Sequence, residues 1–194
     1  MKIRLPALAI MLALLAGCDG EKTVELPPPA TLSRDAQGFF CGMIVEDHPG
    51  PKAQVFHRTD KTPFWFPSVR DAIAYSLFPD EAGNIAIIYV SDMTGYTDWN
   101  NPPQNWIPAQ SAFFVLHSDQ TSGMAAQLGA GVPGSAGRAS GGGNLAYQVG
   151  EAVPFSTREA AEGYVKNHGG NIVRYDEIPQ SYVLDSGEPP ETKL

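Results

Sequence analysis

Two sulfur-containing side chains stand two residues apart in the segment FFCGMIVEDH, which runs from Phe39 to His48. Thiolate and thioether groups are soft ligands, and together they favour Cu(I) among the common metal ions. A regular strand would project Cys41 and Met43 from one face, and Gly42 between them would also permit a sharp bend. The spacing therefore indicates a soft-metal site or, alternatively, a small buried cysteine packed beside a methionine.

Further metal ligands would have to come from other parts of the chain. The available side chains are Met124, Met93, His48 and His117. Zinc usually takes four ligands, with cysteines or histidines paired at short spacing, and a blue copper site needs two histidines beside its cysteine. The four histidines are scattered along the chain, so the sequence predicts neither of these centres.

The N-terminus has the features of a bacterial export signal. Lys2 and Arg4 precede a short apolar run over 5–15, which is followed by the residues LAGC ending at Cys18. A basic start, a short apolar core and small residues before a cleavage point are typical of a signal peptide. LAGC also resembles the lipobox of bacterial lipoproteins, which implies removal of residues 1–17 and lipid attached to Cys18. The alternative is an ordinary signal peptide in which Cys18 is incidental.

Lipidation of Cys18 would leave Cys41 without an intramolecular disulfide partner, because the chain has two cysteines. The bacterial periplasm is oxidising, so an unpaired thiol there needs burial, redox chemistry or a metal to protect it. The sequence thus predicts a chain that faces the periplasm and is lipid-anchored to a bacterial membrane. Either the inner or the outer membrane could hold the anchor.

The chain is acidic, with 194 residues and a formal net charge of -8. Loss of Lys2 and Arg4 with the signal peptide would change this charge to -10 and leave 177 residues. An acidic chain without a basic patch is repelled by nucleic acid, so no nucleic-acid partner is expected. Its field favours cations and cationic partner surfaces.

Composition predicts where the folded part begins and ends. Residues 18–34 contain three consecutive prolines and are expected to form a lipidated tether. Residues 118–150 form a Gly-rich insertion without apolar periodicity, and 181–194 have the composition of a disordered tail. The remaining sequence divides into a first half over 35–110 and a second half over 111–180.

Both halves show the same order of local patterns. Residues 67–79 and 155–170 have helical spacing of apolar residues, and each contains the motif Ser-x-Arg-acidic-Ala near its start. Ser68 can cap the first helix, and Ser156 or Thr157 can cap the second. Strand-like runs lie at 53–57, 62–66 and 84–90 in the first half and at 112–117, 152–155 and 171–175 in the second. The pattern predicts an α+β fold of two small ββαβ-like halves.

A glycine-methionine pair occurs near the start of each half. Gly42-Met43 lies before the first helix, and Gly123-Met124 lies before the second at a longer spacing, because the Gly-rich segment intervenes. This parallel makes Met124 the leading choice for a distant third ligand.

The sequence resembles the NosL family, the lipoprotein accessory factors of nitrous oxide reductase. The resemblance rests on FFCGMIVEDHPGPKAQVF, WFPSVRDAIAYSLFP, IAIIYVSDM and GEAVPFSTREAAEGYVKNHGGNIVRYDEI, and it covers nearly all of 35–178. It implies a copper chaperone that delivers Cu(I) toward the copper–sulfide centre of nitrous oxide reductase, together with an ABC-type assembly complex. It also implies halves similar to organomercurial lyase. The family's cysteine-x-methionine maps onto Cys41 and Met43, and its later glycine-methionine maps onto Gly123 and Met124. The long Gly-rich insertion departs from the family pattern.

Two other interpretations remain at this point. An organomercurial lyase-like enzyme would need two reactive cysteines, and Cys41 alone cannot supply both once Cys18 is lipidated. A structural or interaction lipoprotein would bury Cys41 and bind no metal. We therefore expect a copper carrier and not an enzyme.

Overall fold

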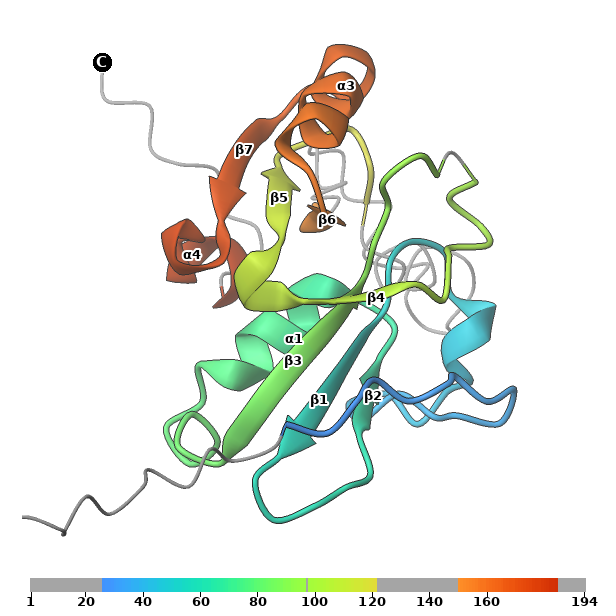
Figure 1. Ribbon diagram of the computed structural model, residues 1–194, viewed down its shortest axis with the longest axis vertical. Helices are drawn as coiled ribbons and strands as arrows, with labels where there is room; N and C mark the ends of the chain where they lie inside the picture. Colours follow the sequence, from blue (N-terminus) through green and yellow to red (C-terminus); the bar gives the residue numbers. More distant parts are fainter. Residues whose placement is uncertain (1–25, 97, 122–149, 185–194) are drawn as a thin grey trace, which may run out of the picture.

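The computed structural model describes residues 26–96, 98–121 and 150–184, and it is an α+β structure with two antiparallel sheets (Figure 1). The first sheet has the order β2-β1-β3-β4 and the second the order β6-β5-β7. The strands are β1 (Ala53–His57), β2 (Phe64–Phe66), β3 (Ile85–Ser91), β4 (Trp106–Pro108), β5 (Phe113–Leu116), β6 (Val153–Phe155) and β7 (Asn171–Arg174). The predicted α+β class and the six predicted strands are confirmed.

Each half contains the same arrangement of two strands, a helix and a third strand. In the first half β1 is the central strand, with β2 on one side and β3 on the other. In the second half β5 takes the central place between β6 and β7. The first sheet gains the short strand β4 at its edge, which the sequence analysis did not predict.

The two main helices begin at polar caps. Helix α1 (Val69–Ser76) starts after Ser68, whose side chain accepts a hydrogen bond from the backbone N–H of Asp71. Helix α3 (Arg158–His168) starts after Thr157, whose side chain accepts from the N–H of Ala160. The serines of the repeated Ser-x-Arg-acidic-Ala motif therefore have different roles. Ser68 caps α1, whereas α3 begins one residue later in the motif and is capped by Thr157.

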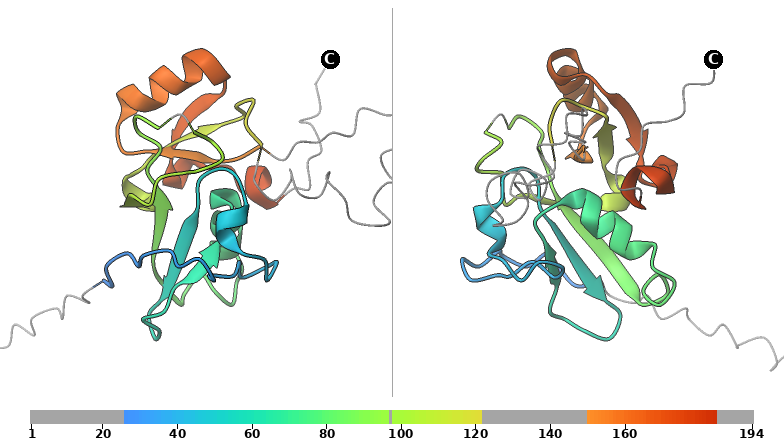
Figure 2. Two further views of the ribbon diagram at one scale, coloured as in Figure 1. Left: turned by 90° about the vertical axis from the view of Figure 1, so that its right-hand side faces the viewer. Right: turned by 180° about the vertical axis from the view of Figure 1, so that it is seen from behind.

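Alternating side chains of the strands build a stack of layers (Figure 2). Val55 of β1 faces the main core with α1, and Phe56 faces the opposite side of the first sheet. On β5, Phe114 points into the same main core, whereas Val115 faces α3. The largest apolar cluster therefore lies between the two sheets and contains side chains from both halves. Within it, the inner face of the second sheet helps to bury α1.

The outer face of the first sheet is covered by the chain that precedes β1. The backbone of Ala30 exchanges hydrogen bonds with the side-chain amide of Gln54, at 2.8 and 3.2 Å, and the hydroxyl of Tyr89 donates to the carbonyl of Pro27. Leu32 is buried in this layer. The described residues 26–34, which the sequence assigns to the tether, are therefore held against the sheet, because their apolar and backbone groups find partners there.

The C-terminal part also continues further than expected. The 3-10 turn η4 (Tyr175–Glu177) leads into the short helix α4 (Gln180–Leu184), which extends four residues into the predicted tail. Val183 of α4 is buried in the main core, and α4 packs against α1. This single buried side chain is too weak a pattern to identify in the sequence.

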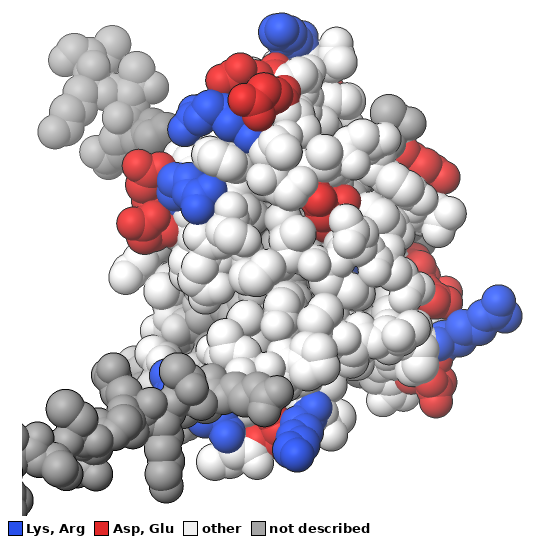
Figure 3. Space-filling view, in the orientation of Figure 1, with Lys and Arg blue, Asp and Glu red and all other residues white. Residues whose placement is uncertain are grey.

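No helix among the described residues is long and apolar enough to cross a membrane. The predicted signal peptide and Cys18 lie outside the described residues. On the face shown in Figure 3, basic side chains are separated from one another around the edge and do not merge into a continuous patch.

Candidate metal centre

Cys41 lies in a short loop that backbone hydrogen bonds close at its base. The N–H of Gly38 donates to the carbonyl of Met43 at 2.8 Å, and the N–H of Gly42 donates to the carbonyl of Gly38 at 2.7 Å. The N–H of Phe39 donates to the carbonyl of Trp65 at 2.8 Å, which fastens the loop to β2. The thiol is therefore presented by a braced loop and not by a regular strand.

Gly42 separates the two sulfur donors and has a φ of +66°. L-residues rarely adopt this conformation, so glycine allows the chain to turn sharply here. Met43 is 40% exposed and Cys41 is partly exposed. Both soft donors are thus accessible from solvent, which argues against the alternative in which Cys41 is a buried packing residue.

The imidazole of His48 lies next to the thiol of Cys41. The 3-10 turn η1 (Val45–Asp47), anchored by the buried side chain of Val45, brings the chain back so that His48 Nε2 lies 4.0 Å from Cys41 Sγ. The His48 side chain is almost fully buried, and its Nδ1 has no hydrogen-bond partner among the described residues. Burial and the nearby Lys52 ammonium lower the pKa of His48, which favours the neutral imidazole that can bind a metal.

The separation of these two atoms suits a small metal ion. Metal–sulfur and metal–nitrogen bonds of about 2.3 and 2.0 Å would span about 4.3 Å if the ligands stood opposite each other. The 4.0 Å distance between Cys41 Sγ and His48 Nε2 fits an ion held between them in a bent geometry. Met43 is adjacent and exposed, so its thioether is a further donor at the same loop.

Lys52 holds the turn that follows His48. Its buried ammonium donates to the carbonyls of His48, Pro49 and Gly50. Burial lowers the pKa of Lys52 to about 8, while Glu151 acts in the opposite direction. Gly50 in turn donates its N–H to the carbonyl of Trp99 at 2.6 Å. The position of the imidazole is therefore set by a buried cation that the sequence analysis did not single out, because a lone lysine carries no local signal.

Exposed aromatic side chains belong to the same loop as the sulfur donors. Phe39 and Phe40 directly precede Cys41 in the sequence and are about half exposed. The ring centroid of Phe40 lies 5.5 Å from that of Phe39 and 6.2 Å from that of Phe78. The loop therefore opens onto an apolar surface, where a bound ion would be less hydrated than on a polar one.

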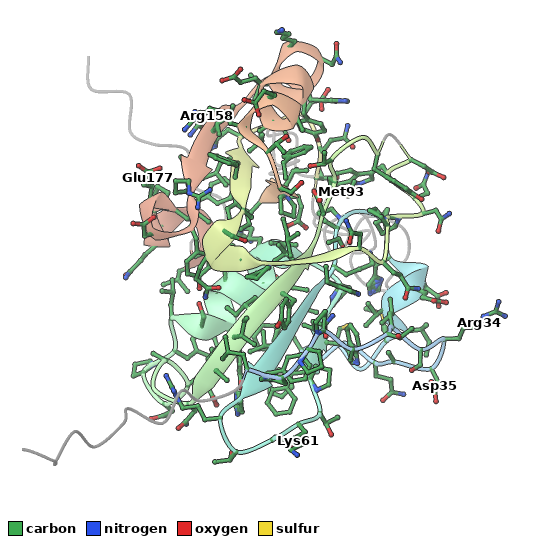
Figure 4. The ribbon with its side chains drawn as sticks, in the orientation of Figure 1. Arg34, Asp35, Lys61, Met93, Arg158 and Glu177 are labelled. Atoms are coloured by element: carbon green, nitrogen blue, oxygen red, sulfur yellow. The ribbon has the colours of Figure 1, made fainter. Side chains whose placement is uncertain are left out.

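The other proposed ligands lie elsewhere or outside the described residues. Met93 is buried beside the second sheet, in the cluster with Val115 (Figure 4). His117 stacks edge-on against Tyr182, with ring centroids 4.8 Å apart. No described contact brings either side chain to Cys41, and Met124 lies outside the described residues. Among the described residues, no group of three or more His, Cys, Asp and Glu side chains could hold a metal.

The chain is similar to known proteins along most of its length. The NosL family model matches residues 29–131 and 146–183. A copper-binding lipoprotein NosL of Achromobacter cycloclastes is 36% identical over 94% of this chain and 83% of that protein. A protein of the same description from Stutzerimonas stutzeri is 28% identical over 92% of this chain and 82% of that protein.

A solved structure has the same fold. The crystal structure of the copper chaperone NosL from Shewanella denitrificans superimposes with a TM-score of 0.64 and 26% sequence identity, covering 81% of this chain and 99% of that one. These relatives are described as copper-binding proteins or a copper chaperone and not as enzymes.

Proposed function

The chain belongs to the NosL family, and on that basis we propose that it is a lipoprotein that binds Cu(I) and passes it to a partner. The ion is its cargo. The observation that carries the proposal is the 4.0 Å approach of His48 Nε2 to Cys41 Sγ, in the loop that also carries the exposed Met43. A thiolate, a neutral imidazole and a thioether are donors that suit Cu(I).

Each donor has a separate task in this proposal. Cys41 binds as the thiolate, so loading releases a proton and the affinity for copper falls as the pH falls. His48 supplies nitrogen from a position set by the Lys52 turn. Met43 supplies a neutral, weaker sulfur ligand. A distant third donor such as Met124 stays part of the proposal as the sequence predicts it.

The exposure of the site favours transfer over storage. With Met43 and Cys41 open to solvent, an incoming ligand of a partner can join the copper before the existing ligands leave. The acceptor in this proposal is the assembly route of the copper–sulfide centre of nitrous oxide reductase, including its ABC-type complex. Lipid on Cys18 holds the chain at the membrane, facing the periplasm.

A competition titration against a chromogenic Cu(I) chelator tests the site. We expect Cys41→Ala to weaken copper binding by at least about 100-fold, since it removes the anionic donor among the three proposed ligands, and Met43→Leu to weaken it by about tenfold. Met93→Leu is the matched control, because that buried methionine lies outside the loop and its replacement should leave the affinity unchanged. The X-ray absorption spectrum of the Cu(I)-loaded chain should show both sulfur and nitrogen ligands around the copper ion.

Unchanged affinity in Cys41→Ala would rule out the site. The delivery role is tested separately in cells: a strain carrying Cys41→Ala should produce nitrous oxide reductase with a depleted copper–sulfide centre, and a Met93→Leu strain should produce normal enzyme. If Cys41→Ala loses copper binding in vitro but both strains produce normal enzyme, the delivery role is refuted. The assignment of Cys41 as a copper ligand would still stand.

A further inference from the structure

Gly38 is the residue on which the Cys41 loop closes. Its N–H donates to the carbonyl of Met43 at 2.8 Å, and its carbonyl accepts from the N–H of Gly42 at 2.7 Å. Gly38 also forms a parallel β-bridge with Trp65 of β2. Its backbone is therefore held both by the loop and by the first sheet, so residue 38 cannot move aside without opening the loop.

The path of the backbone does not require glycine at position 38. Glycine is needed where φ is positive or where another backbone comes close. Gly38 is not among the described residues with a positive φ. The atoms nearest to a Cβ built at this position belong to the side chains of Cys41 and Pro67. What excludes a larger residue is therefore the packing of these two side chains.

The thiol of Cys41 occupies the space that a side chain at position 38 would need. A Cβ on Gly38 would lie 2.7 Å from Cys41 Sγ and 3.0 Å from Pro67 Cδ. Non-bonded heavy atoms attract one another best at about 3.5–4.0 Å, so both contacts would be repulsive. The ring of Pro67 is rigid and the residue is buried, whereas the thiol can turn about one bond into another staggered position. The thiol is therefore the group that would be displaced.

Displacement of the thiol would separate the two donors of the candidate site. In its present rotamer Cys41 Sγ lies 4.0 Å from His48 Nε2. The imidazole cannot follow the thiol, because His48 is almost fully buried and Lys52 holds the carbonyl of that residue. The short distance between sulfur and nitrogen thus depends on the absence of a side chain from Gly38.

Gly42 serves a different purpose in the same loop. Its φ is +66°, and apart from its neighbours in the chain a Cβ there would meet nothing within 4 Å. Gly42 gives the chain its bend, and Gly38 gives the thiol its space. The loop therefore uses two glycines for two separate physical reasons.

We propose that Gly38 is a positioning residue of the copper site. Its missing side chain holds the Cys41 thiol beside His48, so that one sulfur and one nitrogen donor can bind the ion together. Residues that orient metal ligands contribute to affinity although they do not touch the metal. This role rests on the proposed function, whereas the position of the thiol can be measured without copper.

The copper-free test follows the imidazole nitrogen Nε2 of His48 by NMR. Gly38→Ala should shift this resonance in the same direction as Cys41→Ala does, because both changes take the thiol away from the imidazole. Gly83→Ala is the matched control, since a Cβ at Gly83 meets nothing within 4 Å and Gly83 has no positive φ. That variant should leave the resonance where it is in the wild type.

The copper test is a double-mutant cycle measured by competition with a Cu(I) chelator. Gly38→Ala should weaken binding by at least about tenfold, the lower end of the usual effect of residues that orient metal ligands. His48→Leu removes the nitrogen donor with a side chain of similar size. In the His48→Leu chain, Gly38→Ala should weaken binding by less than about twofold, because the pairing that Gly38 supports is already lost.

A further variant separates the position of the thiol from the stability of the fold. Alanine at position 38 also meets the ring of Pro67, so Gly38→Ala should lower the melting temperature. Gly38→Ala/Pro67→Ala removes that contact and keeps the contact with Sγ. This double variant should melt like Pro67→Ala alone and still bind Cu(I) at least about tenfold more weakly than Pro67→Ala.

Three results would overturn the role of Gly38. These are an unshifted His48 resonance in Gly38→Ala, wild-type copper affinity in that variant, and losses that simply add in the cycle with His48→Leu. If Cys41→Ala binds copper weakly while Gly38→Ala binds it normally, only the role of Gly38 fails. Normal binding by Cys41→Ala would refute the proposed function, and the role of Gly38 with it.

Discussion

The two halves share an order of elements and strand neighbours, yet their outer faces are covered in different ways. The outer face of the first sheet is covered by an extended segment that continues into the Cys41 loop. The outer face of the second sheet is covered by its own helix α3, which forms one wall of a groove lined with the aromatic side chains of Tyr96, Phe155 and Tyr164. The same supersecondary unit thus presents a soft-donor loop in one half and an aromatic groove in the other. The covering segments, and not the sheets, distinguish the halves.

The largest expected effect concerns the core that the halves share. Phe114 of the second half is fully buried among side chains of the first, so Phe114→Ala should lower the free energy of unfolding by about 3–5 kcal/mol. Because the cluster is common, amides of β3 and β5 should lose hydrogen-exchange protection together. Phe56→Ala, in the separate cluster beneath the N-terminal segment, is the control. Loss of protection confined to β5 in Phe114→Ala would show that the halves are stabilised independently.

The next effect concerns the joint between the halves. Glu151 Oε1, which lies just before β6 of the second half, accepts hydrogen bonds from the N–H groups of Arg70 and Ala152, both at 2.9 Å. Burial raises the pKa of Glu151 to about 7. The folded chain then keeps a proton that the unfolded chain releases above about pH 4.5, so this contribution to stability is present at low pH and is lost as the pH rises toward 7.

Glu151→Gln keeps an accepting oxygen and removes the titration. Between about pH 5 and about pH 7, wild type should lose up to about 3 kcal/mol of unfolding free energy relative to Glu151→Gln. Urea denaturation at several pH values measures this difference. A constant difference across that range would mean that Glu151 does not titrate between the folded and unfolded chains in this window.

The smallest effect distinguishes the starts of the two helices. Thr157→Ala should lower the free energy of unfolding by about 1 kcal/mol, because the first turn of α3 loses its cap. Ser156→Ala is the matched control, since the hydroxyl of Ser156 contacts Thr94 and caps no helix. If Ser156→Ala were less stable than Thr157→Ala, Ser156 would be the cap of α3, as the repeated Ser-x-Arg-acidic-Ala motif suggests.

Local signals explain which parts of the fold were predictable. Short runs of aromatic and β-branched residues predicted the strands, among them β1 and β5, and apolar spacing with a polar cap predicted α1 and α3, because these preferences depend on residues close in sequence. Strand β4 and helix α4 were missed because each is short and packs through few side chains. The position of residues 26–34 was missed because proline-rich composition does not show that Gln54 and Tyr89 will bind that segment.

The sequence by itself determined the soft donors of the candidate site, since Cys41 and Met43 are neighbours and their chemistry belongs to the residue types. The tertiary structure decided that His48, and not Met93 or His117, stands next to the thiol. That choice depends on the left-handed Gly42, the turn at Val45 and the carbonyls held by Lys52. The aromatic groove likewise exists only because α3 and the segment after β3 meet in space. Contacts between distant segments follow from packing of the whole chain, which local sequence preferences do not encode.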